Sequence, residues 1–168
     1  MASTAIKELK AQTDAAWANL TRQLQGMESS MERFDAPGEW TARQVLSHLL
    51  FEPGWRPVDF LKKFSTTDLP LGEIKPGVVT VTPERQQMTL KQFIDALDTQ
   101  RSEVFAYLES LAEADLQRKA RIPFFKTLMG TDEITLPVYT RTLFAAHWKD
   151  HAGQLAKIRK AVGLPEVS

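Results

Sequence analysis

The sequence predicts an all-α protein, built as a four-helix bundle with two long loops. Four segments repeat apolar residues at intervals of three and four, two of them begin with a capping box, and prolines and glycines gather in the connections. Such a pattern is typical of a mainly up-down-up-down bundle or a close variant. Because 168 residues with 43% apolar content can bury one sizeable core, we expect a single domain over residues 1–168.

The first two helices are predicted from a buried stripe and from a capping signal. The first is expected over residues 3–25, and the apolar residues of its stripe include Ile6, Leu9, Ala16, Trp17, Leu20 and Leu24. The second begins at a capping box, because Thr41 can accept from the amide of Gln44 while the Gln44 side chain reaches back. We expect it to continue to about Glu52, where a Pro-Gly pair interrupts it, and to resume over residues 55–64.

The third helix repeats this start, with Thr89 at the cap and Gln92 three residues later. Its apolar stripe continues to about Leu111. The fourth helix begins near Pro137, since proline suits the first turn of a helix, and it ends by the Gly-Leu-Pro sequence at residues 163–165.

Two connections are long enough to form lids or pocket walls. Residues 65–87 and residues 115–136 each contain prolines and glycines, so we expect both to be mostly irregular. Within the first connection, Val78–Thr82 can pair briefly as a strand.

Composition narrows the classes of partner. Lysine plus arginine equals aspartate plus glutamate, 21 each, so no basic excess favours nucleic-acid binding. The chain opens without an apolar run and contains no stretch that spans a bilayer, so we expect no signal peptide, no membrane partner and a cytoplasmic location. The absence of cysteine excludes disulfides, thiolate ligands and a protein thiol nucleophile.

The chain contains only three histidines, His48, His147 and His151. The last two are four residues apart on the expected fourth helix, so their rings leave one face about 6 Å apart along the axis and can reach one metal ion. They share an apolar stripe with Phe144 and Leu155, where a charged imidazole is costly and a neutral one needs partners. If the second helix faces the fourth, His48 can complete the site. Hydrogen-bonded core histidines that bind no metal are the alternative interpretation.

Three sequence segments occur in an order and spacing that resemble a known family. Residues 39–49 are Glu-Trp-Thr-Ala-Arg-Gln-Val-Leu-Ser-His-Leu, residues 130–136 are Gly-Thr-Asp-Glu-Ile-Thr-Leu, and residues 147–155 are His-Trp-Lys-Asp-His-Ala-Gly-Gln-Leu. They resemble, in turn, the entry to the second helix, the lead into the last helix and the His-x-x-x-His-x-Gly-Gln signature of the DinB/YfiT-like superfamily of helical-bundle proteins.

The resemblance implies a four-helix bundle that holds one divalent metal ion on His48, His147 and His151. Characterised relatives include metal-dependent transferases and isomerases that use small thiols, some members are described as metal-dependent hydrolases, and members are often homodimers. Imidazole ligands suit zinc, nickel, iron and copper alike, so the identity of the metal stays open. Because the chain lacks cysteine, any thiol has to arrive as a cosubstrate.

Two further residues are candidates for catalytic roles. Glu52 falls one turn after His48 on the expected helix, and could be a fourth ligand, a general base or a partner of an imidazole; the alternative is a solvated helix-end glutamate. Gln154 lies three residues after His151 and could orient a ligand; the alternative is a polar residue at the edge of the helix seam.

These observations predict an enzyme that uses a three-histidine metal ion to activate a small thiol or water for transfer to, or hydrolysis of, a small-molecule substrate. Three imidazoles leave an open coordination position, whereas structural zinc sites normally have four protein ligands. The alternative is a non-catalytic bundle that binds a small molecule or dimerises, with a structural or incidental metal.

Overall fold

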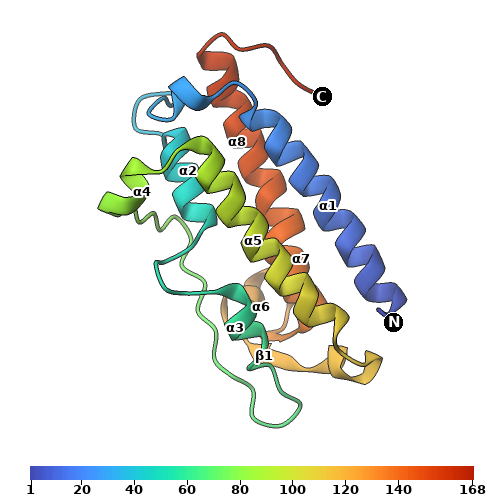
Figure 1. The fold of residues 1–168 in the computed structure, drawn as a ribbon. Coiled ribbons are helices and arrows are strands. Elements are labelled where there is room, and N and C mark those ends of the chain that lie inside the picture. Colours follow the sequence, from blue (N-terminus) through green and yellow to red (C-terminus); the bar gives the residue numbers. More distant parts are fainter.

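A bundle of four helices forms the body of the protein in the computed structural model, which describes all 168 residues (Figure 1). The bundle helices are α1 (Thr4–Leu24), α2 (Ala42–Leu49), α5 (Leu90–Glu109) and α8 (His147–Ala161). α7 (Leu136–Arg141) and a π-helical turn, η3 (Thr142–Ala146), lead directly into α8. The all-α four-helix bundle predicted from the sequence is therefore confirmed.

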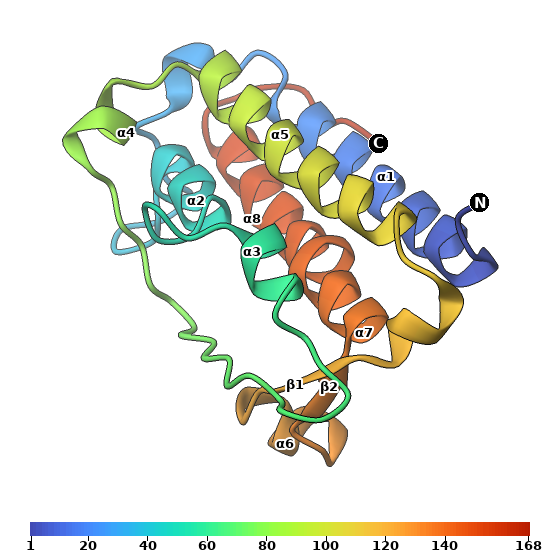
Figure 2. The same cartoon turned by 60° about the horizontal axis from the view of Figure 1, so that its bottom comes forward.

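The directions of the helices follow a variant of the simple up-down order. α1 packs along α8. α5 contacts α1, and α2 contacts both α8 and α5. α2 and α5 begin at the same end of the bundle, because the connection between α3 (Pro57–Leu61) and α5 runs back along its length (Figures 1 and 2). This long connection passes beside α2, and its position matters for the site.

The capping boxes expected from the sequence fix the starts of α2 and α5. The amide of Thr41 donates to Gln44 at 2.8 Å, and the amide of Gln44 donates to the Thr41 hydroxyl at 3.1 Å. Thr89 and Gln92 make the same pair of bonds, at 2.8 and 3.2 Å. Each box satisfies two helix amides that lack intrahelical partners, so both predicted starts are confirmed.

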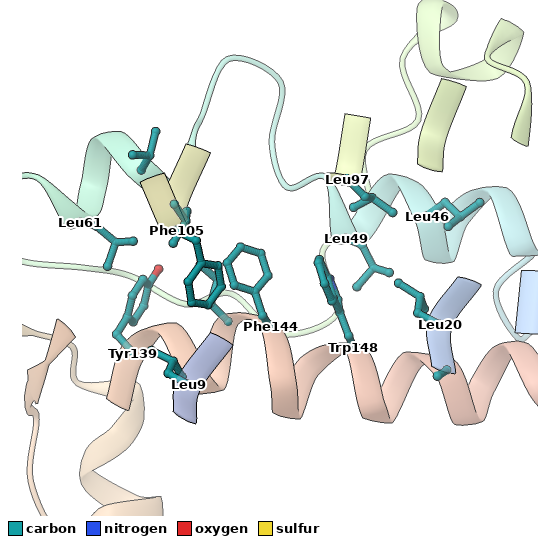
Figure 3. Close-up of a cluster of buried hydrophobic side chains, with 14 of the residues drawn as sticks. Leu9, Leu20, Leu46, Leu49, Leu61, Leu97, Phe105, Tyr139, Phe144 and Trp148 are labelled. Carbon is teal, nitrogen blue, oxygen red and sulfur yellow. The ribbon is translucent and has the colours of Figure 1, made fainter. Parts of the chain in front are cut away.

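One cluster of 32 buried apolar residues fills the space between the bundle helices. Figure 3 shows part of it, with Trp148 and Phe144 of the α8 side facing leucines of α1, α2 and α5. Trp148 is 1% exposed and lies 4.8 Å from Phe144 and 5.2 Å from Trp17, measured between ring centroids. This cluster anchors the short helix α2 through Val45, Leu46 and Leu49, each fully buried.

The end of α2 differs from the prediction. The helix stops at Leu49 rather than near Glu52, and Phe51 adopts a left-handed conformation with φ of 60°. The amide of Phe51 donates to the His48 carbonyl at 3.0 Å, which closes the helix end. Pro53 adds a steric reason, because a residue that precedes proline disfavours the helical conformation. Glu52 therefore lies in a turn and not on the helix of His48.

The two long connections contain more structure than expected. In the first, Val78–Thr82 forms no strand, but Thr82 caps a short helix, α4 (Pro83–Gln87). The second holds η2 (Glu113–Gln117), β1 (Lys119–Arg121), α6 (Phe124–Met129) and β2 (Glu133–Thr135). β1 and β2 pair antiparallel, with Ala120 opposite Ile134. A short 3-10 helix, η1 (Glu28–Ser30), follows α1. None of the helices combines the length and the apolar content that a membrane span requires.

Candidate metal centre

The three histidines come together where α2 packs on α8. His48 comes from the last turn of α2, and His147 and His151 come from the first two turns of α8. One ring nitrogen from each residue forms a group whose members all lie within 4.8 Å of one another. The ring centroids are 4.6–4.9 Å apart, and all three side chains are half-buried. The convergence expected from the sequence is therefore observed.

The π-helical turn before α8 sets which residues of α8 face the core. A π turn accommodates one more residue than an α turn, so the buried stripe of α7 and that of α8 are offset by one position. After the turn the core side chains are Trp148, Ala152 and Leu155, and the two histidines lie beside this stripe, toward α2. The sequence had placed both histidines on the buried stripe itself; the π turn, which periodicity did not predict, moves them to its edge.

The Nδ1 atoms of two histidines face oxygen acceptors. His48 Nδ1 lies 2.7 Å from the carbonyl oxygen of Val78, and His151 Nδ1 lies 2.9 Å from Oε1 of Gln154. Because these oxygens can only accept, each Nδ1 carries the proton and donates it, and each Nε2 keeps its lone pair. This is the tautomer that histidine ligands of metals adopt, with the second nitrogen held by an acceptor.

His147 has the most unusual environment of the three. Burial, followed by the nearby His151 and His48 rings, lowers the pKa of His147 to about 3. Its Nδ1 is fully buried and makes no hydrogen bond of standard geometry, although the Leu143 carbonyl in the preceding π turn acts to raise the pKa. Burial also lowers the pKa of His151, against an opposing effect of Gln154. Both imidazoles are therefore neutral at pH 7, as metal ligation requires.

The residues present fit a divalent metal ion. His48 Nε2 and His147 Nε2 are 2.9 Å apart. Two nitrogens bound to one ion at 2.0–2.1 Å are separated by about 2.9–3.4 Å for bond angles between octahedral and tetrahedral. With His48 Nδ1 bonded to the Val78 carbonyl, its Nε2 lone pair points at His147, and a cation would satisfy such a pair of facing nitrogens.

The two candidate catalytic residues occupy different positions relative to this group. Gln154 contacts His151 directly and holds its ring, which is a positioning contact. The Glu52 carboxylate is exposed and accepts a hydrogen bond from the Thr80 hydroxyl, 2.9 Å from each oxygen. It is not a member of the group of potential ligand atoms. A catalytic role for either residue stays a prediction.

Sequence reasoning missed the segment that orients His48. In addition to the Val78 carbonyl and the Thr80 hydroxyl, this part of the chain is fastened by Arg85, whose guanidinium donates to the carbonyl oxygens of Ser47 and Thr80 at 3.0 Å each. Arg85 is 8% exposed, and burial lowers its pKa, with Glu52 opposing that effect. We name residues 78–80 the strap. The prolines and glycines of the longer connection, residues 65–87, indicated a loop, but not where that loop lies.

Aromatic side chains surround the three imidazoles. The Trp40 ring lies 6.1 Å from His151 at an interplanar angle of 6°, and 4.9 Å from His48. The Phe51 ring lies 6.0 Å from the ring of His147, the other histidine of α8, at an interplanar angle of 23°. These rings pack against the imidazoles and restrict how the imidazoles can rotate.

The fold agrees with what comparisons with known proteins find. The sequence model of the DinB superfamily matches residues 12–155, so the chain belongs to the DinB superfamily. Among solved structures, the chain is similar to YfiT from Bacillus subtilis, described as a probable metal-dependent hydrolase with an unusual four-helix bundle topology. The TM-score is 0.70 at 18% identity, covering 98% of this chain and 92% of YfiT, a likeness that concerns the fold. A comparison with curated proteins gives no match.

Proposed function

We propose that this protein is a metal-dependent enzyme that holds one divalent ion on His48, His147 and His151 and acts on a small-molecule substrate. The observation that carries the proposal is the convergence of the three rings, two of which present Nε2 while Nδ1 donates to an oxygen. Zinc, nickel and iron all accept imidazole ligands, so the proposal leaves the metal open among them.

The likeness to YfiT favours hydrolysis as the reaction, with water as the nucleophile. A divalent ion in such a site acts as a Lewis acid and makes a coordinated water or small thiol acidic enough to ionise near neutral pH. Transfer of a small thiol is the second form of the same proposal, and the thiol would have to come from a cosubstrate because the chain has no cysteine.

The chain's own residues would keep the ligands neutral and fixed. Burial holds His147 and His151 in the uncharged form, so the ligands would not neutralise the charge of the ion. The Val78 carbonyl and Gln154 hold the rings of His48 and His151 in place. Glu52 is bonded to Thr80 rather than grouped with the histidines, so it would not take the coordination position that a ligand from solution needs.

Metal analysis of single variants tests the site. We expect about one ion per chain in the purified protein, and a loss of metal affinity of at least about 100-fold in His48→Ala, His147→Ala and His151→Ala. Lys149→Ala is the matched control, because this exposed lysine lies between the two histidines of α8 and should leave metal content unchanged. Retention of a full equivalent of tightly bound metal by any histidine variant would contradict the proposal.

A catalytic role and a non-catalytic role separate in a second experiment. The metal-loaded protein is assayed with small esters and amides, with and without an added small thiol. Turnover that is lost in His151→Ala, and that another metal-binding protein in its place does not supply, supports the enzyme. Tight metal binding without turnover of any substrate supports the alternative, a bundle that binds a small molecule or dimerises around a structural ion. We also propose that the chain forms a homodimer, which light scattering of the purified protein tests.

A further inference from the structure

Phe51 occupies a backbone position that favours glycine. It is the residue directly after the C-cap of α2 and has φ of 60°, the left-handed conformation that side chains other than those of glycine and asparagine rarely adopt. It is the only residue other than glycine with positive φ in the chain. A bulky side chain at such a position indicates that the ring itself is needed there.

The Phe51 ring continues into an exposed aromatic surface. Its one face lies over His147, as described above, and Trp55 packs against it edge to face, with ring centroids 5.0 Å apart. Trp55 is 38% exposed and also lies 6.3 Å from Phe60. Phe51 and then Trp55 therefore lead from the three-histidine group to a large apolar ring that is partly exposed to solvent.

Three charged side chains close to this surface, those of Glu52, Arg56 and Arg85, are paired within the protein. Glu52 accepts from Thr80, and Arg85 donates to two backbone carbonyls. Arg56, next to Trp55, forms ion pairs with Glu103 at 2.9 Å and with Asp59 at 3.5 Å. Arg56 and Arg85 are thus already engaged by acceptors of the protein, and these surroundings favour an uncharged ligand.

We propose that Phe51 and Trp55 form the subsite that binds a planar apolar group of the substrate. The substrate class is then a small uncharged molecule in which an aromatic or similarly flat group stands next to the carbonyl or other group that reacts. This inference rests on the proposed metal site, because it places the reacting group at the three histidines. Aromatic rings bind flat apolar groups through offset or edge-to-face contacts and through burial of surface from water.

A pair of metal-binding probes tests the subsite without any turnover. Acetohydroxamate and benzohydroxamate bind metal through the same group and differ in a methyl against a phenyl substituent. Zinc content is measured first, and each probe is then titrated calorimetrically into the zinc-loaded protein. We expect benzohydroxamate to bind about tenfold more tightly than acetohydroxamate. In Trp55→Ala the preference should fall to about twofold, while acetohydroxamate affinity stays unchanged. In Phe51→Gly the preference should fall to about twofold as well.

Two features of the variants make the result specific. Glycine suits the backbone at position 51, so Phe51→Gly removes the ring without straining the chain. Phe124→Ala is the matched control, because Phe124 is 37% exposed, nearly the same as Trp55, and its ring packs against Phe125 rather than against Phe51 or Trp55. Its preference for the phenyl probe should remain about tenfold.

The outcomes separate this inference from the proposed function. Equal affinities for the two probes in the zinc-loaded protein, or a preference that survives both Trp55→Ala and Phe51→Gly, would overturn the subsite while leaving the metal site intact. If zinc is not taken up in the first step, and nickel and iron offered in its place are not taken up either, the metal site is overturned, and the subsite with it.

Discussion

Replacing Arg85 by methionine tests whether the strap supports the metal site. The Arg85 guanidinium is 8% exposed and donates to the carbonyl oxygens of Ser47 and Thr80, thereby joining α2 to the strap that orients His48. Methionine keeps a long apolar side chain but removes both donors. We therefore expect Arg85→Met to weaken metal binding as well as the fold.

The size of both effects follows from the contacts. A hydrogen bond from a charged donor contributes about 1.5–3 kcal/mol, and we take the lower value for each of the two bonds because burial also costs the Arg85 guanidinium its hydration. The free energy of unfolding should fall by about 3 kcal/mol, which corresponds to about 6–12 °C in Tm for a chain of this size. If the Val78 carbonyl no longer holds His48, metal affinity should fall about 10–100-fold, as on loss of other outer-sphere partners.

A second buried arginine provides the matched control. Arg159 is 6% exposed and donates to the backbone carbonyls of Gln23, Gln25 and Pro165, away from the histidines. Arg159→Met should lower stability to a similar extent but leave the metal Kd unchanged. Urea unfolding measures the first quantity and competition with a chromophoric chelator measures the second. If both variants lose metal affinity equally, or if Arg85→Met keeps the wild-type Kd, the strap has no specific role at the site.

Three further predictions concern the ligands themselves. Zinc at 100 times its Kd should raise the free energy of unfolding by about 2.7 kcal/mol, or about 5–11 °C in Tm by calorimetry, and His151→Ala should abolish this shift. Gln154→Ala should weaken zinc binding about tenfold by chelator competition while Gln154→Glu, which keeps an acceptor for His151, should preserve it. In the metal-free protein, stability should fall as the pH drops from about 6.5 toward 3, because over that range the unfolded chain binds a proton on His147 that the folded chain does not. His147 contributes at most about 1.4 kcal/mol per pH unit to the slope, and His147→Gln should reduce the slope in urea titrations at several pH values.

Local sequence signals predicted the bundle and brought the histidines to one face, because those signals act within one or two helical turns. The capping boxes at Thr41 and Thr89 depend on residues three apart, and they appear as expected. The spacing of His147 and His151 fixes their common face in the same way. Spacing alone could not place His48 opposite them, because it does not say which helices pack together. The resemblance to a family of bundles supplied the pairing of α2 with α8.

What the sequence did not predict depends on contacts between distant segments. The strap reaches His48 across 30 residues of chain, and nothing in the sequence around Val78 marks a carbonyl that accepts from an imidazole. Phe51 violates the rule that glycine follows a helix, so the rule could not find the end of α2. The assignment of Glu52 to the helix of His48 failed for the same reason, since one left-handed residue redirects the chain.

The position of the site at the junction of α2 and α8 couples metal binding to the fold. α2 has only eight residues, too few for an isolated helix to be stable in water, so its place depends on Leu46 and Leu49 in the core and on the strap. His48, on its last turn, would be joined through the ion to two residues of α8, a longer helix anchored along α1. An ion held there would act as a cross-link between a marginal helix and a stable one. Metal removal should therefore loosen α2 and the strap before the rest of the bundle, which amide hydrogen exchange can follow residue by residue.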